Sequence, residues 1–199
     1  FFEGYGREEG QNPYYSNLYS VKFDGSGFSH LTPEDATHSI NASDEGNYFV
    51  DNYSRVDLPT KSVLRDGSGK VIATLEEADI SQMVEQGWKA PESFKVKAAD
   101  GATDIYGVMW KPFDFDSTKT YPVISYVYPG PQTEPFPANF TIGGSRARTT
   151  TLAQVGFIVV AMGNRGGSPI RSKYYHNYGY GDMRDYPLAD NKYGIEQLA

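Results

Sequence analysis

The sequence predicts a protein of mixed fold class, with a β-rich first part and an α/β second part. A repeated hairpin motif indicates the β-rich part, and continuous apolar strands that alternate with helical segments indicate the α/β part. The two parts also differ in charge, because residues 1–90 contain 15 acidic and 7 basic side chains, whereas residues 91–199 contain 10 and 11. We therefore expect a domain boundary near residue 90.

The repeat consists of two octapeptides that lie 42 residues apart, Ser20–Gly27 and Ser62–Gly69. Both contain Asp-Gly-Ser-Gly between β-forming residues, which is typical of a hairpin because Asp and Gly tolerate the backbone angles of tight turns. Between the two copies, residues 42–50 predict another turn that leads into a strand. One hairpin in every ~40–45 residues is the spacing of a four-stranded propeller blade. The first part is therefore expected to contain propeller blades.

Residues 76–88 change to a helical period. Three apolar residues would share one face of this helix: Ile80, Met83 and Val84. Glu76 and Glu77 would lie in its first turn, and Gly87 is placed to end it. We predict a short linker helix between the two domains.

The second part reads as a hairpin followed by buried strands and helices. The expected elements are strands at 94–98, 105–110, 121–128 and 156–162, and helices at 149–155 and 185–199. Asp100-Gly101 would turn the hairpin, and residues 163–167 would break the last strand sharply. The final helix would turn four residues inward: Leu188, Tyr193, Ile195 and Leu198. Continuous apolar strands separated by helices predict an α/β sheet with parallel strands.

Composition excludes several classes of site and protein. With 39% hydrophobic and 22% charged residues the chain should fold. Cysteine is absent, so disulfides and thiolate metal sites are excluded. His30, His38 and His176 lack the spacing of metal ligands, and we expect each at a loop or strand surface, with no cofactor or metal. No membrane span is expected because no apolar run reaches about 18 residues. No nucleic-acid partner is expected because the net charge is −7 and basic residues are not clustered.

Six segments stand in a characteristic order along the chain: Leu31–Glu34, Tyr48–Ser54, Pro91–Phe94, Ile105–Pro112, Tyr121–Pro131 and Gly156–Gly166. Together they resemble the prolyl oligopeptidase family of serine peptidases, in its dipeptidyl peptidase IV-like branch. The resemblance covers essentially the whole chain. One departure is that Asn164 replaces the aspartate of the family's Asp-Arg-Gly loop.

The resemblance implies the last blade or blades of a β-propeller, followed by the N-terminal part of an α/β-hydrolase domain. Residues 1–90 would be the C-terminal blade region with the linker helix. Residues 91–199 would be the start of the peptidase domain, truncated before the nucleophile elbow. The chain begins as if within a strand and stops within a helix, so we expect an internal piece of a larger protein.

The same resemblance implies a serine exopeptidase that releases N-terminal dipeptides, Xaa-Pro or Xaa-Ala, by an acyl-enzyme route. Its partner would be a peptide with a free amino terminus, it would need no cofactor, and the parent protein would be a homodimer in the periplasm or secreted. Tyr128 would be the oxyanion stabiliser. Losing one such donor typically costs ~100- to 1000-fold in turnover, because charge on the carbonyl oxygen is left uncompensated.

The catalytic serine is missing from the sequence. Gly-x-Ser-x-Gly does not occur, since Gly166–Ile170 and Gly27–Leu31 each lack the second glycine. In the family the Ser, Asp and His would all follow Ala199, so the chain alone is expected to be inactive. The adjacent acids Glu8-Glu9 and Glu76-Glu77 do not match the family's substrate-gripping pair and are expected to be solvated.

Other functions stay open from the sequence. A tripeptidyl or acylaminoacyl peptidase would share the hydrolase segment and differ mainly in the propeller. A non-catalytic interaction module with a degenerate hydrolase domain is the alternative from another class, and a carbohydrate-binding propeller is suggested only by the 16 tyrosines. An intact Gly-x-Ser-x-Gly after Ala199 in the parent gene would separate the enzyme from the module.

Overall fold

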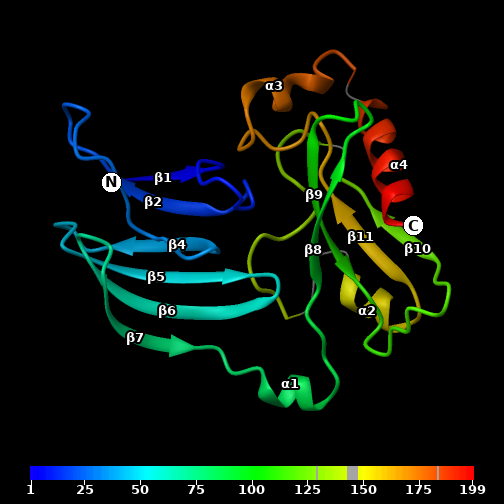
Figure 1. The fold of residues 1–199 in the computed structure, drawn as a ribbon, viewed down its shortest axis with the longest axis horizontal. Coiled ribbons are helices and arrows are strands. Elements are labelled where there is room, and N and C mark those ends of the chain that lie inside the picture. Colours follow the sequence, from blue (N-terminus) through cyan, green and yellow to red (C-terminus); the bar gives the residue numbers. More distant parts are fainter. Residues whose placement is uncertain (129, 143–147, 183) are drawn as a thin grey trace. The chain divides into compact units, whose positions relative to one another are not determined.

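The fold is described by a computed structural model that covers residues 1–128, 130–142, 148–182 and 184–199. These residues form three sheets and a few short helices (Figure 1). The chain divides into two compact units: unit 1 comprises residues 1–82 and 138–140, and unit 2 comprises residues 83–137 and 141–199. Across both units the described residues are rich in sheet and contain few helices.

Unit 1 contains two open antiparallel sheets. The first sheet joins β1 (Phe2–Tyr5), β2 (Ser16–Ser20) and β3 (Ser29–His30) in that order. The second sheet joins β4 (Thr37–Ala42), β5 (Tyr48–Arg55), β6 (Leu58–Asp66) and β7 (Val71–Glu77) in sequence order. Within each sheet every strand pairs with the next along the chain, so unit 1 is a series of hairpins.

Both predicted Asp-Gly hairpins are confirmed, the first between β2 and β3 and the second between β6 and β7. In the first, Asp24 Oδ1 accepts hydrogen bonds from the Ser26 backbone N–H at 2.9 Å and the Ser26 hydroxyl at 2.7 Å. In the second, Asp66 Oδ1 accepts from Ser68 N–H at 2.9 Å and its hydroxyl at 2.5 Å. The repeated motif therefore performs the same task twice, because each Asp closes its turn by bonding two residues ahead.

The core of unit 1 joins residues from both of its sheets. Leu18 from β2, Phe49 from β5 and Leu31 from the connecting segment are buried together, with Ile40 from β4 packed against them. Phe49 is only 1% exposed. Burying such a side chain contributes roughly 1.5–3 kcal/mol.

The predicted linker helix is much shorter than expected. Strand β7 continues through Glu76 and Glu77, which pair with Ser62 and Lys61 of β6, so their assignment to a helical turn is wrong. Backbone pairing with the neighbouring strand outweighs the weak helical preference of this segment. Only α1 (Ser81–Glu85) is helical, and none of its residues is buried. Gly87 ends it as predicted, with φ 88° and a hydrogen bond from its N–H to Val84 O at 2.9 Å.

Unit 2 contains a four-stranded mixed sheet in the order β10-β11-β9-β8. Its strands are β8 (Glu92–Lys97), β9 (Asp104–Trp110), β10 (Val123–Tyr126) and β11 (Ile158–Met162). The β8–β9 hairpin is confirmed, and β11 is a buried strand as predicted. Among the described strands, however, only β10 and β11 are parallel, so the expected parallel sheet is correct for that pair alone.

The helices of unit 2 are α2 (Thr149–Gln154), α3 (Lys173–His176), the 3₁₀ helix η1 (Asn177–Gly179) and α4 (Tyr186–Leu198). The predicted helix α2 connects β10 to β11 and lies against β11. Helix α4, red in Figure 1, packs on β8 and covers the core formed by Val96, Ile105 and Met162.

The inward face of α4 differs from the prediction. Ile195 and Leu198 do pack on the core, but Leu188 is 68% exposed and Tyr193 is 41% exposed. The buried residues form another stripe at helical spacing: Tyr186, Pro187, Asp190, Asn191 and Gly194. Two of these, Asp190 and Asn191, are polar, so the apolar pattern of the sequence does not reveal the stripe.

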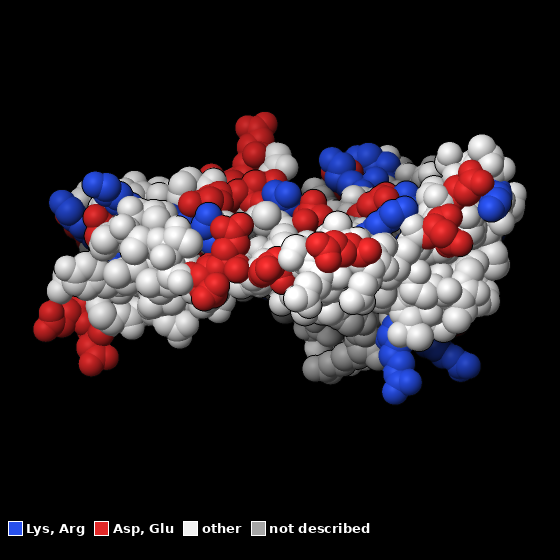
Figure 2. Space-filling model, turned by 90° about the horizontal axis from the view of Figure 1, so that it is seen from below, with Lys and Arg blue, Asp and Glu red and all other residues white. Residues whose placement is uncertain are grey.

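The surface carries charges of both signs. On the face shown in Figure 2, acidic and basic side chains are interspersed rather than gathered into one large field of a single sign.

Within the part of the chain that the structure describes, no helix is both long and apolar enough to cross a membrane.

Candidate functional site

The candidate site lies where β10 and β11 end in unit 2. The two strands are parallel, with Tyr126 opposite Ala161, so the segments that follow them leave the sheet at the same edge. In open α/β sheets, functional residues gather at this carboxyl edge because the loops after neighbouring strands converge there. Tyr128 follows β10 by two residues, and the segment 163–168 follows β11 directly.

Tyr128, the predicted oxyanion stabiliser, is partly accessible. Tyr128 is 42% exposed, and its ring lies against the backbone of Gly130. A Cβ placed on Gly130 would stand 2.7 Å from Tyr128 Cε1, so this position must be glycine for the ring to lie there. Pro129, which the sequence places in the same turn, lies outside the described residues. An accessible phenol at this edge can reach a bound molecule.

The segment after β11 is a buried turn, as the sequence predicts. Asn164 is only 4% exposed, and its side-chain amide donates to the Arg165 carbonyl at 2.8 Å. Gly166 has φ 90°, and a Cβ there would stand 2.4 Å from the ring of Tyr186. The chain can turn here because glycine adopts positive φ and leaves room for that ring.

Arg165 ties this turn to α4 and to the β8–β9 hairpin. Its Nη2 lies 2.7 Å from Asp190 Oδ1, and its backbone N–H donates to Asp190 Oδ2 at 2.9 Å. Its Nη1 lies 3.0 Å from Asp100 Oδ2, and its guanidinium stacks 4.1 Å from the centre of the Tyr178 ring. Hydrogen bonds to Asp190 raise the pKa of Arg165 against the opposing effect of burial. Arg165 therefore anchors the turn.

Asp190 is the central acceptor of this network and was not predicted from the sequence. Its side chain is 0% exposed, and it also accepts a hydrogen bond from the Ala99 backbone N–H at 3.0 Å. It comes 25 residues after Arg165 with no local pattern between them. A polar residue on the buried stripe of a predicted helix is the one signal that could have identified it.

Glu134 reaches the same turn from the loop after β10. Its Oε1 accepts a hydrogen bond from the Ser168 backbone N–H at 3.0 Å. Its carboxylate also lies directly against the backbones of Gly163 and Gly167. The loops that follow β10 and β11 are thus joined at this edge, a contact over 34 residues that sequence reasoning missed.

A cavity of about 280 Å³ borders the turn. Pro131 lines it from the loop after β10 and Gly166 from the turn after β11, together with His176, Tyr180 and Tyr186. His176 Nδ1 lies 2.8 Å from the Gly167 carbonyl, so this histidine supports the turn. Burial raises the pKa of Tyr186, with a smaller contribution from the charge of Glu134.

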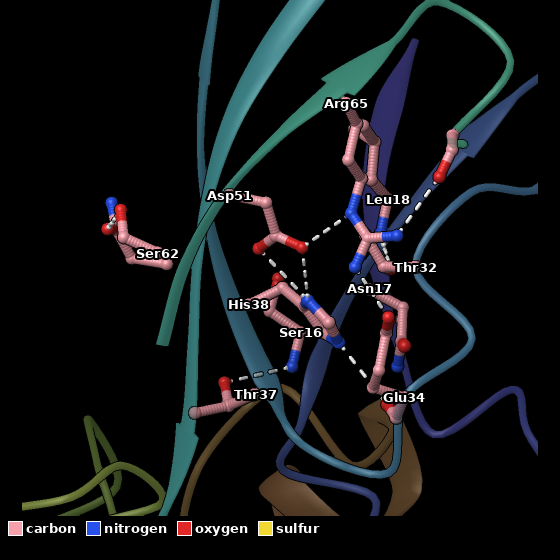
Figure 3. Close-up of polar contacts among 12 residues, drawn as sticks. Ser16, Asn17, Leu18, Thr32, Glu34, Thr37, His38, Asp51, Ser62 and Arg65 are labelled. Carbon is pink, nitrogen blue, oxygen red and sulfur yellow. Dashed lines mark hydrogen bonds and ion pairs between the residues drawn. The ribbon is translucent and has the colours of Figure 1, made fainter. Parts of the chain in front are cut away.

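A second polar cluster is buried in unit 1 (Figure 3). His38 of β4 was expected at the surface but is 4% exposed, because its ring fits between two acceptors. Its Nδ1 lies 3.0 Å from both carboxylate oxygens of Asp51, and its Nε2 lies 3.2 Å from the Glu34 carbonyl. Ligand atoms of Glu34, His38 and Asp51 all lie within 4.8 Å of one another, a spacing at which a metal ion could be held.

Arg65 of β6 already supplies the positive charge in this cluster. Its Nε lies 2.8 Å from Asp51 Oδ2, and its Nη2 lies 2.7 Å from Glu34 Oε2. Burial opposes the charge on Arg65, but hydrogen bonds to Glu34 and Asp51 outweigh it and raise the pKa of the guanidinium. A guanidinium between the two carboxylates occupies the place that a metal ion would need. The cluster is therefore a structural network that holds β4, β5 and β6 together.

The adjacent acid pairs differ from each other. Glu76 and Glu77 are exposed, as predicted. Glu8 is half-buried rather than freely solvated, because its carboxylate accepts a hydrogen bond from the Tyr19 hydroxyl at 2.9 Å. Burial and this bond raise the pKa of Tyr19. Glu8 thus acts in the packing of the first sheet.

Known proteins match the chain in sequence and in structure. Residues 1–60 match the sequence model of the family described as the dipeptidyl peptidase IV (DPP IV) N-terminal region. Dipeptidyl peptidase 8 from Homo sapiens is 27% identical over 207 aligned residues, which cover 100% of this chain and 22% of that protein. A protein of Emericella nidulans assigned as dipeptidyl-aminopeptidase B is 28% identical over 75% of this chain and 17% of its own length.

A solved structure shares the fold. The crystal structure of a Bacteroides ovatus protein, assigned as a dipeptidyl aminopeptidase IV, matches 92% of this chain with a TM-score of 0.77 and 30% identity. That match covers 26% of the Bacteroides chain, so this chain spans about a quarter of the length of that relative. Family match, relatives and solved structure agree with the motifs read from the sequence. Over nearly its whole length the chain is therefore similar to one part of dipeptidyl peptidase IV-like proteins.

Proposed function

We propose that this chain is part of a serine-type peptidase that removes Xaa-Pro or Xaa-Ala dipeptides from the free amino terminus of peptides. The relatives, which are dipeptidyl peptidases, support the general activity. The observation that carries the proposal is the position of Tyr128, an accessible phenol at the carboxyl edge of the parallel β10–β11 pair.

The proposed architecture places blades of a β-propeller in residues 1–90 and the start of an α/β-hydrolase domain in residues 91–199. The second sheet of unit 1 supports the first assignment, because four antiparallel strands in sequence order form a propeller blade. The parallel β10–β11 pair with α2 between its strands supports the second, because strand–helix–strand units build α/β sheets.

In the proposed reaction, a serine oxygen attacks the carbonyl carbon of the scissile peptide bond, and the carbonyl oxygen becomes negatively charged. The Tyr128 hydroxyl donates a hydrogen bond to that oxygen. The amine then leaves with a proton, and water releases the dipeptide from the acyl-enzyme. Tyr128 contributes selectively to the transition state because the negative charge exists only there and in the tetrahedral intermediate.

The serine itself is proposed to come from residues outside the 199, since these contain no Gly-x-Ser-x-Gly. We accordingly propose that the chain alone is inactive. By family resemblance we also propose a homodimer in the periplasm or outside the cell. Light scattering of the complete protein and fractionation of its host would test these two points, and a cytosolic monomer would contradict both.

The experiment compares the product of the complete gene with the 199-residue chain. The complete protein should hydrolyse Gly-Pro-p-nitroanilide, should not act on its N-acetylated form, and should react with a fluorophosphonate probe. The chain alone should do none of these. Cleavage of a blocked or tripeptidyl substrate in preference would point to an acylaminoacyl or tripeptidyl peptidase. Absence of hydrolysis and labelling in the complete protein would leave the non-catalytic interaction module.

A further inference from the structure

Glu134 joins two segments that are far apart in the sequence. It belongs to the loop after β10, yet its carboxylate contacts the turn after β11. Ser168 is only 3% exposed, and its backbone N–H donates a hydrogen bond to Glu134 Oε1 at 3.0 Å. A charged acceptor makes such a bond stronger than a neutral one would.

Two glycines make room for this carboxylate. A Cβ on Gly163 would stand 2.7 Å from Glu134 Oε2, and one on Gly167 would stand 2.6 Å from Oε1. For Gly163, the three nearest atoms to that Cβ all belong to the Glu134 carboxylate. Gly163 is also outside the positive-φ region. Its lack of a side chain is therefore explained by Glu134 alone.

The same loop carries Tyr128. The Tyr128 ring rests on the backbone of Gly130, within four residues of the point at which Glu134 joins the second loop. One end of the loop is held by β10, whose last residue is Tyr126. The contact of Glu134 with Ser168 holds its other end. A loop fixed at both ends has little freedom, so the position of Tyr128 depends on both attachments.

We propose that Glu134 is a positioning residue that fixes the Tyr128 loop against the turn after β11. The claim about position stands on the contacts alone, whereas its consequence for catalysis rests on the proposed function. If a catalytic hydrogen-bond donor is displaced by about 1 Å from the reacting atom, the reaction rate can fall by as much as about 100-fold. Glu134 would influence turnover without touching the substrate.

The position of Tyr128 can be measured directly in the 199-residue chain labelled with 3-fluorotyrosine. Its ¹⁹F resonance is the one that disappears in Tyr128→Phe. We expect this resonance to move in Glu134→Ala and to return close to its original frequency in Glu134→Gln, whose amide oxygen still accepts from Ser168. The matched control is Glu196→Ala, because Glu196 lies on the exposed side of α4 in the same unit.

Gly163→Ala tests the contact from its other side and removes no polar group. The added methyl would displace the Glu134 carboxylate and should move the Tyr128 resonance as Glu134→Ala does. Combined with Glu134→Ala it should cause no further shift, because the obstructing carboxylate is gone. A Tyr128 resonance that stays unchanged in Glu134→Ala and Gly163→Ala would overturn the inference.

Kinetics of the complete protein separate this inference from the proposed function. We expect Glu134→Ala to lower kcat by ~10- to 100-fold with little change in KM, and Glu134→Gln to recover most of the loss. If Tyr128→Phe lowers kcat and Glu134→Ala does not, the positioning claim fails and the proposed function stands. If the Tyr128 resonance responds to Glu134 but the complete protein hydrolyses no peptide, the positioning claim stands and the proposed function fails.

Discussion

Replacing Arg65 with methionine should destabilise unit 1 strongly. Methionine keeps much of the side-chain length but removes every donor of the guanidinium. Asp51, whose side chain is 0% exposed, would keep its contact with His38 but lose the guanidinium that lies 2.8 Å away in the native fold. Removing one partner of a buried ion pair costs about 3–5 kcal/mol, because much of the buried charge is left uncompensated.

Arg55 provides a matched control on the neighbouring strand β5. Like Arg65 it contacts two acids, Asp57 at 2.9 Å and Asp35 at 3.6 Å, but its own side chain is 31% exposed. Exposed pairs contribute about 0.2–1 kcal/mol, because water already stabilises both charges. Arg55→Met should therefore have a much smaller effect than Arg65→Met.

Both tryptophans, Trp88 and Trp110, belong to unit 2, so tryptophan fluorescence does not report the unfolding of unit 1. Hydrogen exchange of individual backbone amides can report unit 1 separately. Amides of β5 and β6 should exchange roughly 100- to 5000-fold faster in Arg65→Met, which corresponds to the expected 3–5 kcal/mol. In Arg55→Met they should exchange at most about 5-fold faster. Equal effects of the two substitutions would refute the conclusion that burial makes this network important.

Three further predictions concern single residues. Asp190→Ala should lower the stability of unit 2 by about 3–5 kcal/mol, seen as an earlier denaturant midpoint of tryptophan fluorescence. The reason is that Arg165, whose side chain is 11% exposed, loses its fully buried partner and keeps only the more exposed Asp100 and the Tyr178 ring; a midpoint equal to the wild type would contradict this. Hydrogen bonds from Thr103 hold the pKa of Asp100 at about 2, below its ordinary value of 3.8, so its stabilising contribution is present above pH 4 and is lost as the pH falls toward 2. Asp100→Asn should flatten the acid-unfolding curve of unit 2 over that range, and an unchanged curve would exclude this contribution. Gly69→Ala should be far more damaging to thermal stability than Gly27→Ala at the same motif position, because both have positive φ but only Gly69 would bring its Cβ within 2.5 Å of the Leu31 backbone; equal losses would show that the close approach is unimportant.

Local patterns in the sequence were sufficient for the elements that local physics determines. The Asp24 and Asp66 turns form because each side chain bonds two residues ahead, an interaction visible in the motif itself. Strand β11 was predicted because it is apolar throughout. Gly87 ends α1 because glycine alone adopts its left-handed angle at little cost.

The features that the sequence did not predict correctly depend on interactions between residues that are far apart in the chain. Glu76 and Glu77 look helical locally, but β6 supplies pairing partners that a single segment does not reveal. Asp190 is polar and buried because Arg165, 25 residues earlier, reaches it. The bond between Glu134 and Ser168 spans 34 residues, and that between Arg65 and Glu34 spans 31. No periodicity or motif announces such pairs.

The proposed oxyanion role of Tyr128 is tested most directly by the turnover of Tyr128→Phe in the product of the complete gene, measured on Gly-Pro-p-nitroanilide. The substitution removes one hydroxyl and keeps the ring that rests on Gly130. We predict a ~100- to 1000-fold fall in kcat with little change in KM, because the lost hydrogen bond exists only when the carbonyl oxygen is charged. A kcat equal to that of the unaltered enzyme would contradict the assignment of Tyr128 to the oxyanion site.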